Sequence, residues 1–382
     1  MIDLNIKREK MEYDLVIVGA GPAGLSAAIN FKKLCQSAGK NFSVCVVEKG
    51  SEVGAHILSG AILQPTALDE LIDGWRSDEN CPVKTLVKSE ELKYLSESKS
   101  YNLPKFFIPK VMHNDNNFII SLGSLCKWLG TKAEAMGVEI YPGFAASDII
   151  LSEDKLAGII TSDLGLEKDG KPGSNFQPGI EIHSKYTLFA EGCRGHLGKR
   201  LIEQFNLRES SQHQTYGIGL KELWEVNPTN SDPGHVMHTI GWPLDTETYG
   251  GSFLYHLSKN LVSVGFVIGL DYKNPYMSPY EEFQRFKTHP FVKEIFNGGR
   301  RISYGARALN EGGWQSLPKL TFPGGALVGC DAGTLNTPKI KGTHTAMKSG
   351  MIASSEVFDE LSLGKKNSEI IHYQKEFVKS WA

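Results

Sequence analysis

YDLVIV at residues 13–18, followed by GAGPAG at residues 19–24, is the stretch that decides the fold. A short β-rich run meets a glycine turn and then an alanine-rich segment, which is the order strand, tight turn, helix. The first glycine makes the turn, the second lets a pyrophosphate approach the backbone, and the third lets the helix pack on the strand, with the helix N-terminus facing the phosphates. The pattern predicts a dinucleotide site that includes Gly19, Gly21, Ala23 and Gly24.

A second apolar run, Val44–Glu48 (VCVVE), predicts the next strand of a parallel βαβ unit. Glu48 ends this strand, in the position of a carboxylate that accepts a hydrogen bond from a ribose hydroxyl. The alternative is a glycine turn without a ligand and a solvated glutamate at the end of the strand. The complete order of the parts favours the dinucleotide site, although the spacing does not distinguish NAD from FAD.

Two further strands run into glycine turns, at 189–192 (FAEG) and 327–331 (LVGCD). Each turn alone is typical of an ordinary loop between a strand and a helix. Three such turns in one chain favour FAD, because two-lobed FAD enzymes return to the dinucleotide several times. The predicted FAD site therefore also includes Gly192 and Asp331, with Asp331 placed to bond a ribitol or ribose hydroxyl.

The polar run PKIKGTHTAM precedes a predicted helix near the end of the sequence. Its amides and the hydroxyls of Thr343 and Thr345 are candidates for bonding the pyrimidine edge of a flavin, where negative charge gathers on reduction. Asn336 is a further candidate donor at the same edge. The alternative for the threonines is helix capping, and Lys339 and Lys341 are expected to be solvated.

A second lobe is predicted at residues 216–315, which are rich in Gly, Tyr and Trp and contain alternating stretches such as 261–267. We expect an antiparallel, β-rich structure there. The FAD-binding domain is expected to be discontinuous, at 1–60, 113–215 and 316–382, and the second lobe is expected at 61–112 and 216–315. Helices are predicted at 121–137 and 343–360, and an exposed loop at 165–179.

A double glycine, Gly250-Gly251, follows Tyr249 in the second lobe. Glycine inside a β pattern indicates a backbone that closely approaches a ligand, or else a bulge or hairpin turn. The residues alone leave both interpretations open.

The run YNLPKFFIPKVM at 101–112 combines apolar side chains with lysines, and its two prolines argue against a regular helix. Apolar side chains with basic flanks are typical of a segment that dips into a membrane interface. The alternative is a loop that packs on its own protein. The predicted membrane-contacting residues are Leu103, Phe106, Phe107 and Ile108.

The composition excludes several classes of function. The chain has 382 residues, with 41 Lys and Arg against 43 Asp and Glu, so no basic field favours nucleic acid. Six cysteines, none closer than ten positions to another, form no CxxC pair, which argues against a zinc ribbon or a local iron–sulfur site. We find no HExxH, GxSxG or P-loop motif and predict no metal site; the histidines are expected to be hydrogen-bonded structural residues. No signal peptide precedes the first strand, and the longest apolar run, 261–270, is too short to span a bilayer.

Long stretches of the sequence resemble the electron transfer flavoprotein–ubiquinone oxidoreductase family: IVGAGPAGLSAA, GAHILSGA, FAEGCRGHLGK, YGIGLKELW, TYGGSFLYHL, SYGARALNEGGWQSLPKLTFPGG and NTPKIKGTHTAMKSG. The resemblance implies an FAD domain, a quinone domain and a [4Fe–4S] domain. It also implies a flavoprotein that takes electrons from electron transfer flavoprotein and reduces ubiquinone at the membrane surface. The fold class is thus expected to be α/β and two-lobed, with a Rossmann-like βαβ domain resembling the glutathione-reductase and hydroxylase type and a β-rich, quinone-binding lobe.

The resemblance also implies roles for residues. Gly250 and Gly251 would line the quinone head group, and Asn336 and Thr343 would lie by the flavin ring. The family's membrane-contacting hairpin falls on about residues 91–112, which strengthens the membrane interpretation of that segment.

The sequence departs from the family at its end. Family chains continue past the point that matches Lys379-Ser380-Trp381 into a second membrane-contacting helix and a cysteine-rich cluster domain, and the six cysteines here match none of the cluster ligands. The expectation is a truncated family member without its iron–sulfur domain, or a cluster-free relative. Two other functions stay open: an NAD(P)H-dependent flavin monooxygenase on the same fold, and an FAD-binding fragment without full activity. Without a presequence, the expected location is the cytoplasmic face of a bacterial inner membrane, as a peripheral protein; a processed organellar chain would have the same sequence features.

Overall fold

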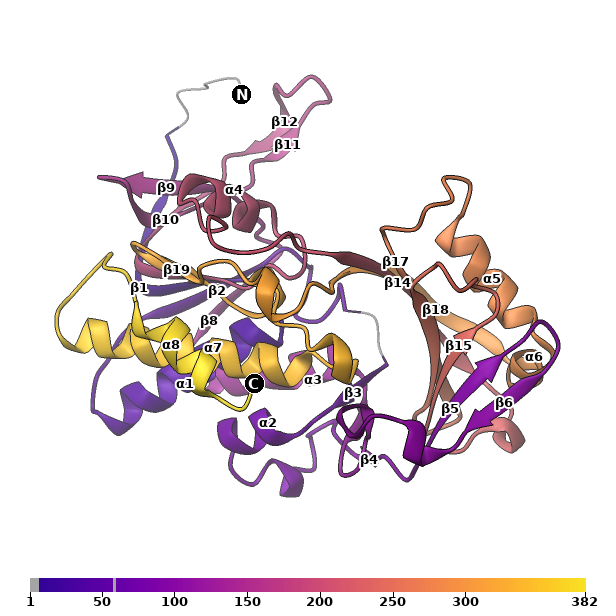
Figure 1. Ribbon diagram of the computed structural model, residues 1–382. Helices are drawn as coiled ribbons and strands as arrows, with labels where there is room; N and C mark the ends of the chain where they lie inside the picture. Colours follow the sequence, from indigo (N-terminus) through magenta and orange to yellow (C-terminus); the bar gives the residue numbers. More distant parts are fainter. Residues whose placement is uncertain (1–6, 58–59) are drawn as a thin grey trace.

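The computed structural model describes residues 7–57 and 60–382 and arranges them in two lobes, each centred on its own β-sheet (Figure 1). The first lobe is a largely parallel sheet covered by helices. The second is a mainly antiparallel sheet with two helices on one face. This arrangement confirms the predicted two-lobed α/β fold.

The first sheet has the strand order β19-β20-β13-β1-β2-β8, with β10 and β9 added beside β13. Strand β1 pairs in parallel with both β2 and β13, which confirms the predicted βαβ unit. Its residues Leu15, Val16 and Ile17 are fully buried, as expected of a central strand that is covered on both faces. The strands are β1 (Lys10–Val18), β2 (Val44–Glu48), β8 (Glu139–Pro142), β9 (Ala146–Ser152), β10 (Lys155–Thr161), β13 (Glu181–Phe189), β19 (Thr321–Phe322) and β20 (Gly325–Leu327).

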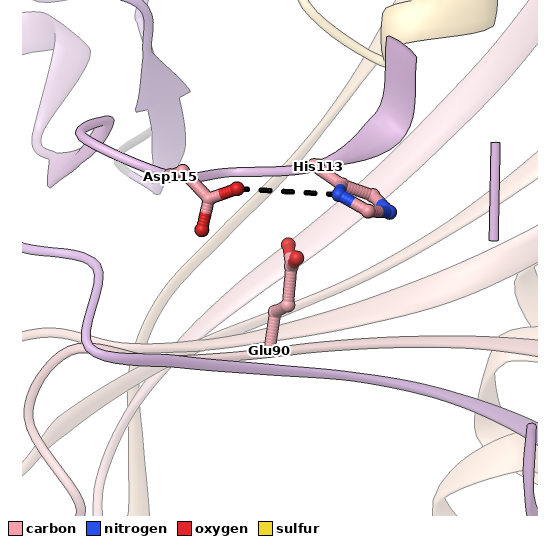
Figure 2. A group of neighbouring side chains, drawn as sticks. All are labelled: Glu90, His113 and Asp115. Atoms are coloured by element: carbon pink, nitrogen blue, oxygen red, sulfur yellow. Dashed lines mark ion pairs between the residues drawn. The ribbon is translucent and has the colours of Figure 1, made fainter. Parts of the chain in front are cut away.

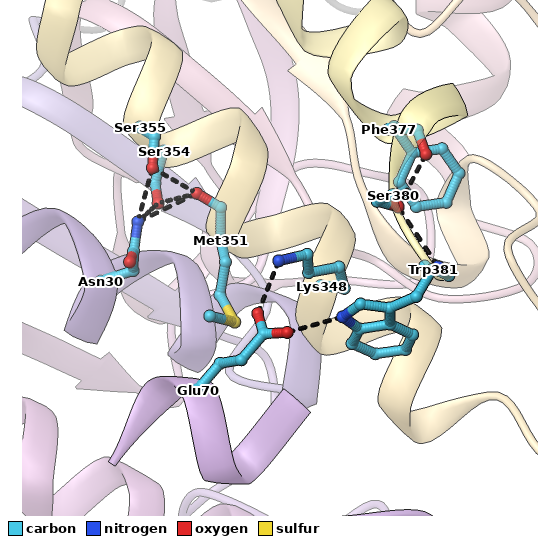
Figure 3. Close-up of polar contacts among 10 residues, drawn as sticks. Asn30, Glu70, Lys348, Met351, Ser354, Ser355, Phe377, Ser380 and Trp381 are labelled. Atoms are coloured by element: carbon cyan, nitrogen blue, oxygen red, sulfur yellow. Dashed lines mark hydrogen bonds and ion pairs between the residues drawn. The ribbon is translucent and has the colours of Figure 1, made fainter. Parts of the chain in front are cut away.

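Two helices of this lobe, α1 and α7, pack very closely. A Cβ atom on Gly350 of α7 would lie 2.2 Å from the carbonyl oxygen of Ala23 in α1, so only glycine permits this contact. Further along, the Asn30 amide donates to Met351 O and to the hydroxyls of Ser354 and Ser355, at 2.9 to 3.0 Å (Figure 3). The helices of the lobe are α1 (Pro22–Ser37), α2 (Thr66–Leu71), α3 (Leu122–Ala135), α4 (His196–Gln204), α7 (Thr343–Ser362) and α8 (His372–Lys379), and the predictions at 121–137 and 343–360 are confirmed by α3 and α7.

The segment after α8 lies against α2 and α7. The Trp381 indole donates to Glu70 at 2.6 Å, and Lys348 forms an ion pair with the other oxygen of the same carboxylate (Figure 3). The Trp381 ring stacks on His344 with 5.8 Å between ring centroids. These contacts fix the segment over the N-terminal turn of α7.

The second sheet has the order β18-β14-β17-β16-β15-β5-β6. The strands that lie within residues 216–315 pair antiparallel, as predicted, whereas β15 also runs parallel to β5, which lies outside that range. This parallel pair joins two strands that are far apart in the sequence, so no local sequence pattern reveals it. The strands are β5 (Ser89–Leu95), β6 (Ser100–Leu103), β14 (Tyr216–Glu225), β15 (His235–Gly241), β16 (Gly250–His256), β17 (Leu261–Gly269) and β18 (Arg300–Asn310).

Strand β17 is buried on both faces, although its alternating pattern predicts one exposed face. Helices α5 (Pro279–Thr288) and α6 (Pro290–Phe296) cover one face, where Phe266 packs against Phe283 and Phe286. On the other face a Cβ atom at Gly60 would overlap the Ser263 hydroxyl, so the chain near residue 60 lies directly on the sheet. The small residues of β17 therefore face the first lobe rather than solvent.

The first boundary between the two lobes lies later in the sequence than the predicted residue 61. Ala67, Leu71, Trp75 and Val83 belong to the core of the first lobe, so residues 63–83 pack mainly there, whereas Ile62 packs with Phe253 and Tyr255 of the second sheet. A small sheet of β3 (Ala61–Leu63), β7 (Phe118–Ile120) and β4 (Thr85–Leu86) lies at this transition. The predicted loop at 165–179 contains a hairpin of β11 (Leu164–Leu166) and β12 (Pro172–Gln177), which is largely exposed. Single 3₁₀ turns occur at Trp75–Ser77, Lys105–Phe107, Lys110–Met112, Pro228–Asn230, Trp314–Ser316, Gly329–Asp331 and Thr337–Lys339.

Candidate functional site

The three glycines of the β1–α1 turn meet different surroundings. Gly19 has a φ of +107°, and a Cβ atom there would lie 2.5 Å from Ala190 O. A Cβ atom at Gly24 would lie 2.1 Å from Gly19 O, so the third glycine permits the predicted contact of helix and strand. At Gly21 a Cβ atom would meet nothing within 4 Å. The space that the pattern reserves for a pyrophosphate is therefore open.

A cleft lies in front of this turn. It is formed by the glycine turn, the end of β2, residues 54–57 and 144–146, the loop after β13, and Arg307 of the second lobe. No side chain in the described part of the chain caps α1, so the first free amides of this helix are available to an anion. Open space at the second glycine together with an uncapped helix N-terminus fits a dinucleotide pyrophosphate. Residues that line the cleft include Gly19, Gly21, Glu48, Arg194, His196 and Arg307.

Glu48 is held at the edge of the cleft by the backbone. Its two carboxylate oxygens accept hydrogen bonds from the amides of Ala20 at 2.9 Å and Gly50 at 2.7 Å. The carboxylate thus ties the end of β2 to the glycine turn. Its predicted bond to a ribose hydroxyl is compatible with this position and stays a prediction.

Glu191 lines the cleft, and Asp331 lies next to it. Asp331 lies in the 3₁₀ turn Gly329–Asp331, is buried, and accepts from the Glu191 amide at 3.4 Å. Burial raises the pKa of Asp331 well above its usual value, and the nearby Glu191 carboxylate adds to this shift. The Glu191 side chain accepts from the amide of Gly198, near the start of α4, at 2.7 Å. Burial and the Glu191 carboxylate therefore both favour the neutral form of the Asp331 carboxyl group.

The predicted flavin-edge residues lie at the start of α7. Asn336 uses its side-chain oxygen to accept from the Lys339 amide at 3.2 Å, and Thr345 donates its hydroxyl proton to Thr334 O and Gly342 O at 2.7 and 2.9 Å. Thr343 is the first residue of α7 and is half-buried. The capping alternative is not what the described residues show, because Gly342 occupies the N-cap and no side chain caps the helix.

Two expectations about this segment are wrong. Lys341 is 4% exposed instead of solvated; its ammonium donates to Lys339 O at 2.8 Å, and burial lowers its pKa to about 8. His344 is buried, and neither ring nitrogen has a hydrogen-bond partner among the described residues, although we expected a hydrogen-bonded histidine. Burial lowers its pKa to about 3. Buried polar groups without partners are rare, so the unpartnered His344 nitrogens indicate that the start of α7 can bind a polar ligand.

Gly250 and Gly251 begin β16 without a bulge, since the register with β17 runs unbroken from Gly250 to His256. A Cβ atom at Gly250 would lie 2.4 Å from Val267 O, and one at Gly251 would lie 2.7 Å from Thr239 O. The protein's own backbone therefore requires both glycines. The predicted contact with a quinone head group stays a prediction.

Three titratable residues that the sequence reasoning missed share the sheet face with Gly251. Lys221 donates to Gly60 O at 2.6 Å, and burial, with a smaller contribution from Arg307, lowers its pKa to about 8. His238 and Tyr255 are joined by a hydrogen bond of 2.9 Å, and burial lowers the pKa of His238 to about 4. Strand alternation is the only sequence signal that could have grouped them, and it requires the register of four strands, β14, β17, β16 and β15.

The predicted membrane-contacting residues lie on and beside the 3₁₀ turn Lys105–Phe107. Phe106 and Phe107 are 79% and 68% exposed, so these two rings do not pack on the protein, whereas Leu103 and Ile108 are half-buried. Among the described residues, no helix is long and apolar enough to cross a membrane.

Below this turn, Glu90, His113 and Asp115 bring ligand atoms within 4.8 Å of one another (Figure 2). Lys105 lies 3.2 Å from Glu90 and 3.6 Å from Asp115, so an ammonium group already supplies positive charge there. The cluster therefore fixes the aromatic turn to β5, and we assign it no metal.

The sequence reasoning also missed two arginines of the cleft, Arg194 and Arg307. Arg194 lies two residues after the predicted Gly192, and its guanidinium lies over the Tyr216 ring at 4.9 Å. The φ of +91° at Gly192 confirms the predicted turn. A signal for Arg194 therefore existed, whereas Arg307 comes from another lobe and no local pattern connects it with the cleft.

Two family models match the chain. One is described as ETF-QO, ubiquinone-binding, and matches residues 216–309; the other is an NAD(P)-binding Rossmann-like domain at residues 17–87. An electron transfer flavoprotein-ubiquinone oxidoreductase of Pseudomonas aeruginosa is 54% identical over 98% of this chain and 69% of its own length. The mitochondrial protein of that name from Mus musculus is 52% identical over 99% of this chain and 62% of its own length.

Solved structures show the same fold at low identity. A geranylgeranyl bacteriochlorophyll reductase-like protein from Thermoplasma acidophilum superimposes with a TM-score of 0.71 at 17% identity, covering 97% of this chain and 83% of its own. A flavin-dependent brominase variant gives a TM-score of 0.68 at 16% identity, covering 96% of this chain and 84% of its own. These likenesses concern the two-lobed architecture alone.

Proposed function

Because this chain belongs to the electron transfer flavoprotein–ubiquinone oxidoreductase family, we propose that it binds FAD and passes electrons from electron transfer flavoprotein to ubiquinone. The observation that carries the proposal is identity above 50% along nearly the whole chain, including a match of the second lobe to a ubiquinone-binding family model. An NAD(P)H-dependent monooxygenase is not favoured, because the relatives and that lobe both indicate a quinone as the acceptor.

FAD, when bound, supplies chemistry that joins one-electron and two-electron partners. The protein's part is to bind and orient it. The open position at Gly21 and the start of α1 would hold the pyrophosphate, Glu48 the ribose, and Asp331 the ribitol. Thr343 and Asn336 would lie by the flavin ring. The unpartnered ring nitrogens of His344 support a polar ligand at this end of α7.

Conversion of a quinone to a quinol takes up two protons. The titratable groups on the sheet face of Gly251 include the Lys221 ammonium and the hydrogen-bonded pair of His238 and Tyr255. A lysine with a pKa of about 8 releases a proton readily near neutral pH. We therefore propose Lys221 Nζ, which lies on the sheet face of Gly251 and 5.5 Å from the Phe253 ring, as the first candidate proton donor to the quinone.

The chain spans 69% of the bacterial relative and 62% of the mouse relative, so the activity of the whole protein is part of the proposal. We propose no [4Fe–4S] site within the described residues, because the group of potential metal ligands found there, Glu90, His113 and Asp115, contains no cysteine. Any cluster of the family is expected to need ligands other than the cysteines of this chain.

We also propose peripheral attachment to a membrane through the aromatic turn at Phe106 and Phe107, at the cytoplasmic face of a bacterial inner membrane. The two rings lie 4.2 Å apart, both are largely exposed, and lysines flank them. Aromatic side chains beside lysines suit the boundary between head groups and acyl chains.

A visible spectrum of the purified chain tests the redox proposal. We expect flavin bands that bleach on anaerobic photoreduction and return when a short-chain ubiquinone is added. A flavin that stays reduced would contradict quinone reduction by this chain, and a protein that takes up no FAD would overturn the cofactor assignment. Flavin bleaching by NADPH alone would instead favour the monooxygenase.

Liposome flotation tests the membrane proposal. Phe107→Asp should lower the fraction of protein bound to vesicles containing anionic lipid by about tenfold. The reason is that a charged side chain replaces an aromatic ring that would be buried in the lipid. The matched control is Tyr276→Asp, at a ring that is 94% exposed elsewhere in the second lobe and should be neutral. Equal binding of both variants and the wild type would exclude this turn as the contact.

A further inference from the structure

Arg307 belongs to the second lobe but lies in the cleft of the first. It is on β18, opposite Gly219 of β14, and it lines the same cleft as the glycine turn. A Cβ atom at Gly192 would lie 2.5 Å from Nη2 of Arg307, so the guanidinium rests against the turn that follows β13. The absence of a side chain at Gly192 is what gives the arginine this position.

The charge of Arg307 is not neutralised by the protein. Of the arginines on the same strand, Arg300 pairs with Glu225 at 2.6 Å and Arg301 with Glu222 at 3.1 Å. Arg307 has no ion pair or hydrogen bond within the described ranges, and its side chain is exposed to the cleft. Because the side chain is exposed to the cleft, the N–H donors of the guanidinium are free to bind an anionic group of a ligand.

The carboxylates of the cleft do not fill this role. Glu48 is engaged by the amides of Ala20 and Gly50, and Glu191 accepts from the Gly198 amide and lies 3.3 Å from His196. Arg307 also lies close enough to Lys221 to lower the pKa of that ammonium, so this neighbouring charge is of the same sign and cannot pair with it. The cleft therefore presents a free guanidinium opposite the open end of α1, and an anionic ligand group would complete it.

We propose that Arg307 binds the pyrophosphate of FAD, so that the second lobe takes part in holding the cofactor; this inference rests on the FAD assignment made above. The planar fork of a guanidinium can donate two parallel hydrogen bonds to phosphate oxygens, which a lysine cannot do. The cofactor then joins the two lobes, because its pyrophosphate contacts α1 of one and β18 of the other. Binding of the cofactor should thus fix the relative position of the lobes.

Ligand titrations of the apoprotein test this. In fluorescence titrations with FAD, Arg307→Met should raise the dissociation constant by about 10- to 100-fold, the range expected when a charge-assisted hydrogen bond is lost. Arg307→Lys should give an intermediate value, because it keeps the charge and loses the fork. The matched control, Arg300→Met, removes the same charge from the exposed far end of the same strand and should bind FAD like the wild type.

A second titration separates binding from folding. ADP carries the pyrophosphate without the flavin, and adenosine carries neither phosphate. Arg307→Met should therefore weaken the binding of ADP and leave the binding of adenosine unchanged. Equal loss for both ligands, or unaltered binding of FAD by Arg307→Met, would overturn the proposal. If Arg307→Met does not fold, the same comparison is made with Arg307→Lys. A larger loss of affinity for ADP than for adenosine then supports the proposal, and an equal loss overturns it. A wild-type protein that binds no FAD would instead refute the cofactor assignment itself.

Discussion

The glycine turn of the first lobe and the double glycine of the β-rich lobe are similar in sequence, but the space around them differs. At Gly21 a side chain would enter open space, whereas at Gly250 and Gly251 it would collide with backbone carbonyls of Val267 and Thr239. The two outer glycines of the turn, Gly19 and Gly24, are crowded in the same way. Of these five glycines, only Gly21 could carry a Cβ atom without a close contact to other protein atoms.

The difference shows what a glycine motif does and does not indicate. Glycine is required wherever two backbones approach closely, and a ligand is one such case among several. At the turn, the open position and the uncapped helix point to a ligand. At the start of β16, sheet packing explains the residues by itself, so the quinone contact rests on family resemblance rather than on space.

The largest effect is expected at Gly24. In Gly24→Val a branched side chain would overlap Gly19 O, which a Cβ atom alone already approaches to 2.1 Å, and Ile17 lies 3.0 Å away. Helix α1 would have to move off β1, at a cost of about 4 kcal/mol or more in the free energy of unfolding. Urea unfolding of the apoprotein measures this, and a wild-type midpoint would show that the close contact is not needed.

The next effect separates folding from binding at Gly21. Gly21→Val should leave the stability of the apoprotein within about 0.5 kcal/mol, since nothing lies within 4 Å of the new Cβ atom and φ is −82°. It should weaken the binding of FAD by at least about 100-fold, because the valine side chain would occupy the space of the pyrophosphate. Stoichiometric FAD in the purified variant would refute the site, and Gly24→Val provides the opposite pattern as the comparison.

Much of the first lobe could be predicted because its determinants are contiguous. Strand, turn and helix follow one another within residues 13–37, and each local preference agrees with the fold. The position of Glu48 follows from the same unit. The hydrogen bonds of Glu48 to the turn could not be foreseen, since they depend on how β2 lies beside β1.

The rest of the site arises from contacts between distant segments. Arg307 reaches the cleft only through the packing of the two lobes, and Lys341 is buried although nothing local distinguishes it from a solvated lysine. The parallel pairing of β15 with β5 joins strands far apart in the sequence. A sequence pattern reports which face of an element is apolar, but not which other element covers it.

A smaller effect tests the second glycine pair. Gly250→Ala should lower the stability of the protein by about 2 kcal/mol in the absence of any quinone, because the new methyl group meets Val267 O and Leu244. Gly219→Ala, on β14 of the same sheet, is the matched control, since its nearest contact would be an ordinary 3.5 Å. Thermal unfolding compares them. Equal stabilities would mean that sheet packing does not explain Gly250, and a ligand would then be the better reason.

The smallest effect concerns the far end of β16 and depends on pH. Burial, with a smaller contribution from His235, lowers the pKa of His256 to about 4, and its Nδ1 accepts from the Asp232 amide at 3.1 Å. The unfolded chain, with a histidine pKa of about 6.5, then binds more protons than the folded one between pH 6.5 and 4, so stability must fall as the pH falls through this window. His256→Asn keeps an acceptor near that amide and removes the titration. Between pH 7 and 5.5 the wild type should therefore lose about 1 kcal/mol more than the variant in urea unfolding. Parallel curves for the two proteins would show that this end of the strand opens to water, unlike the glycine end, where contacts independent of pH set the stability.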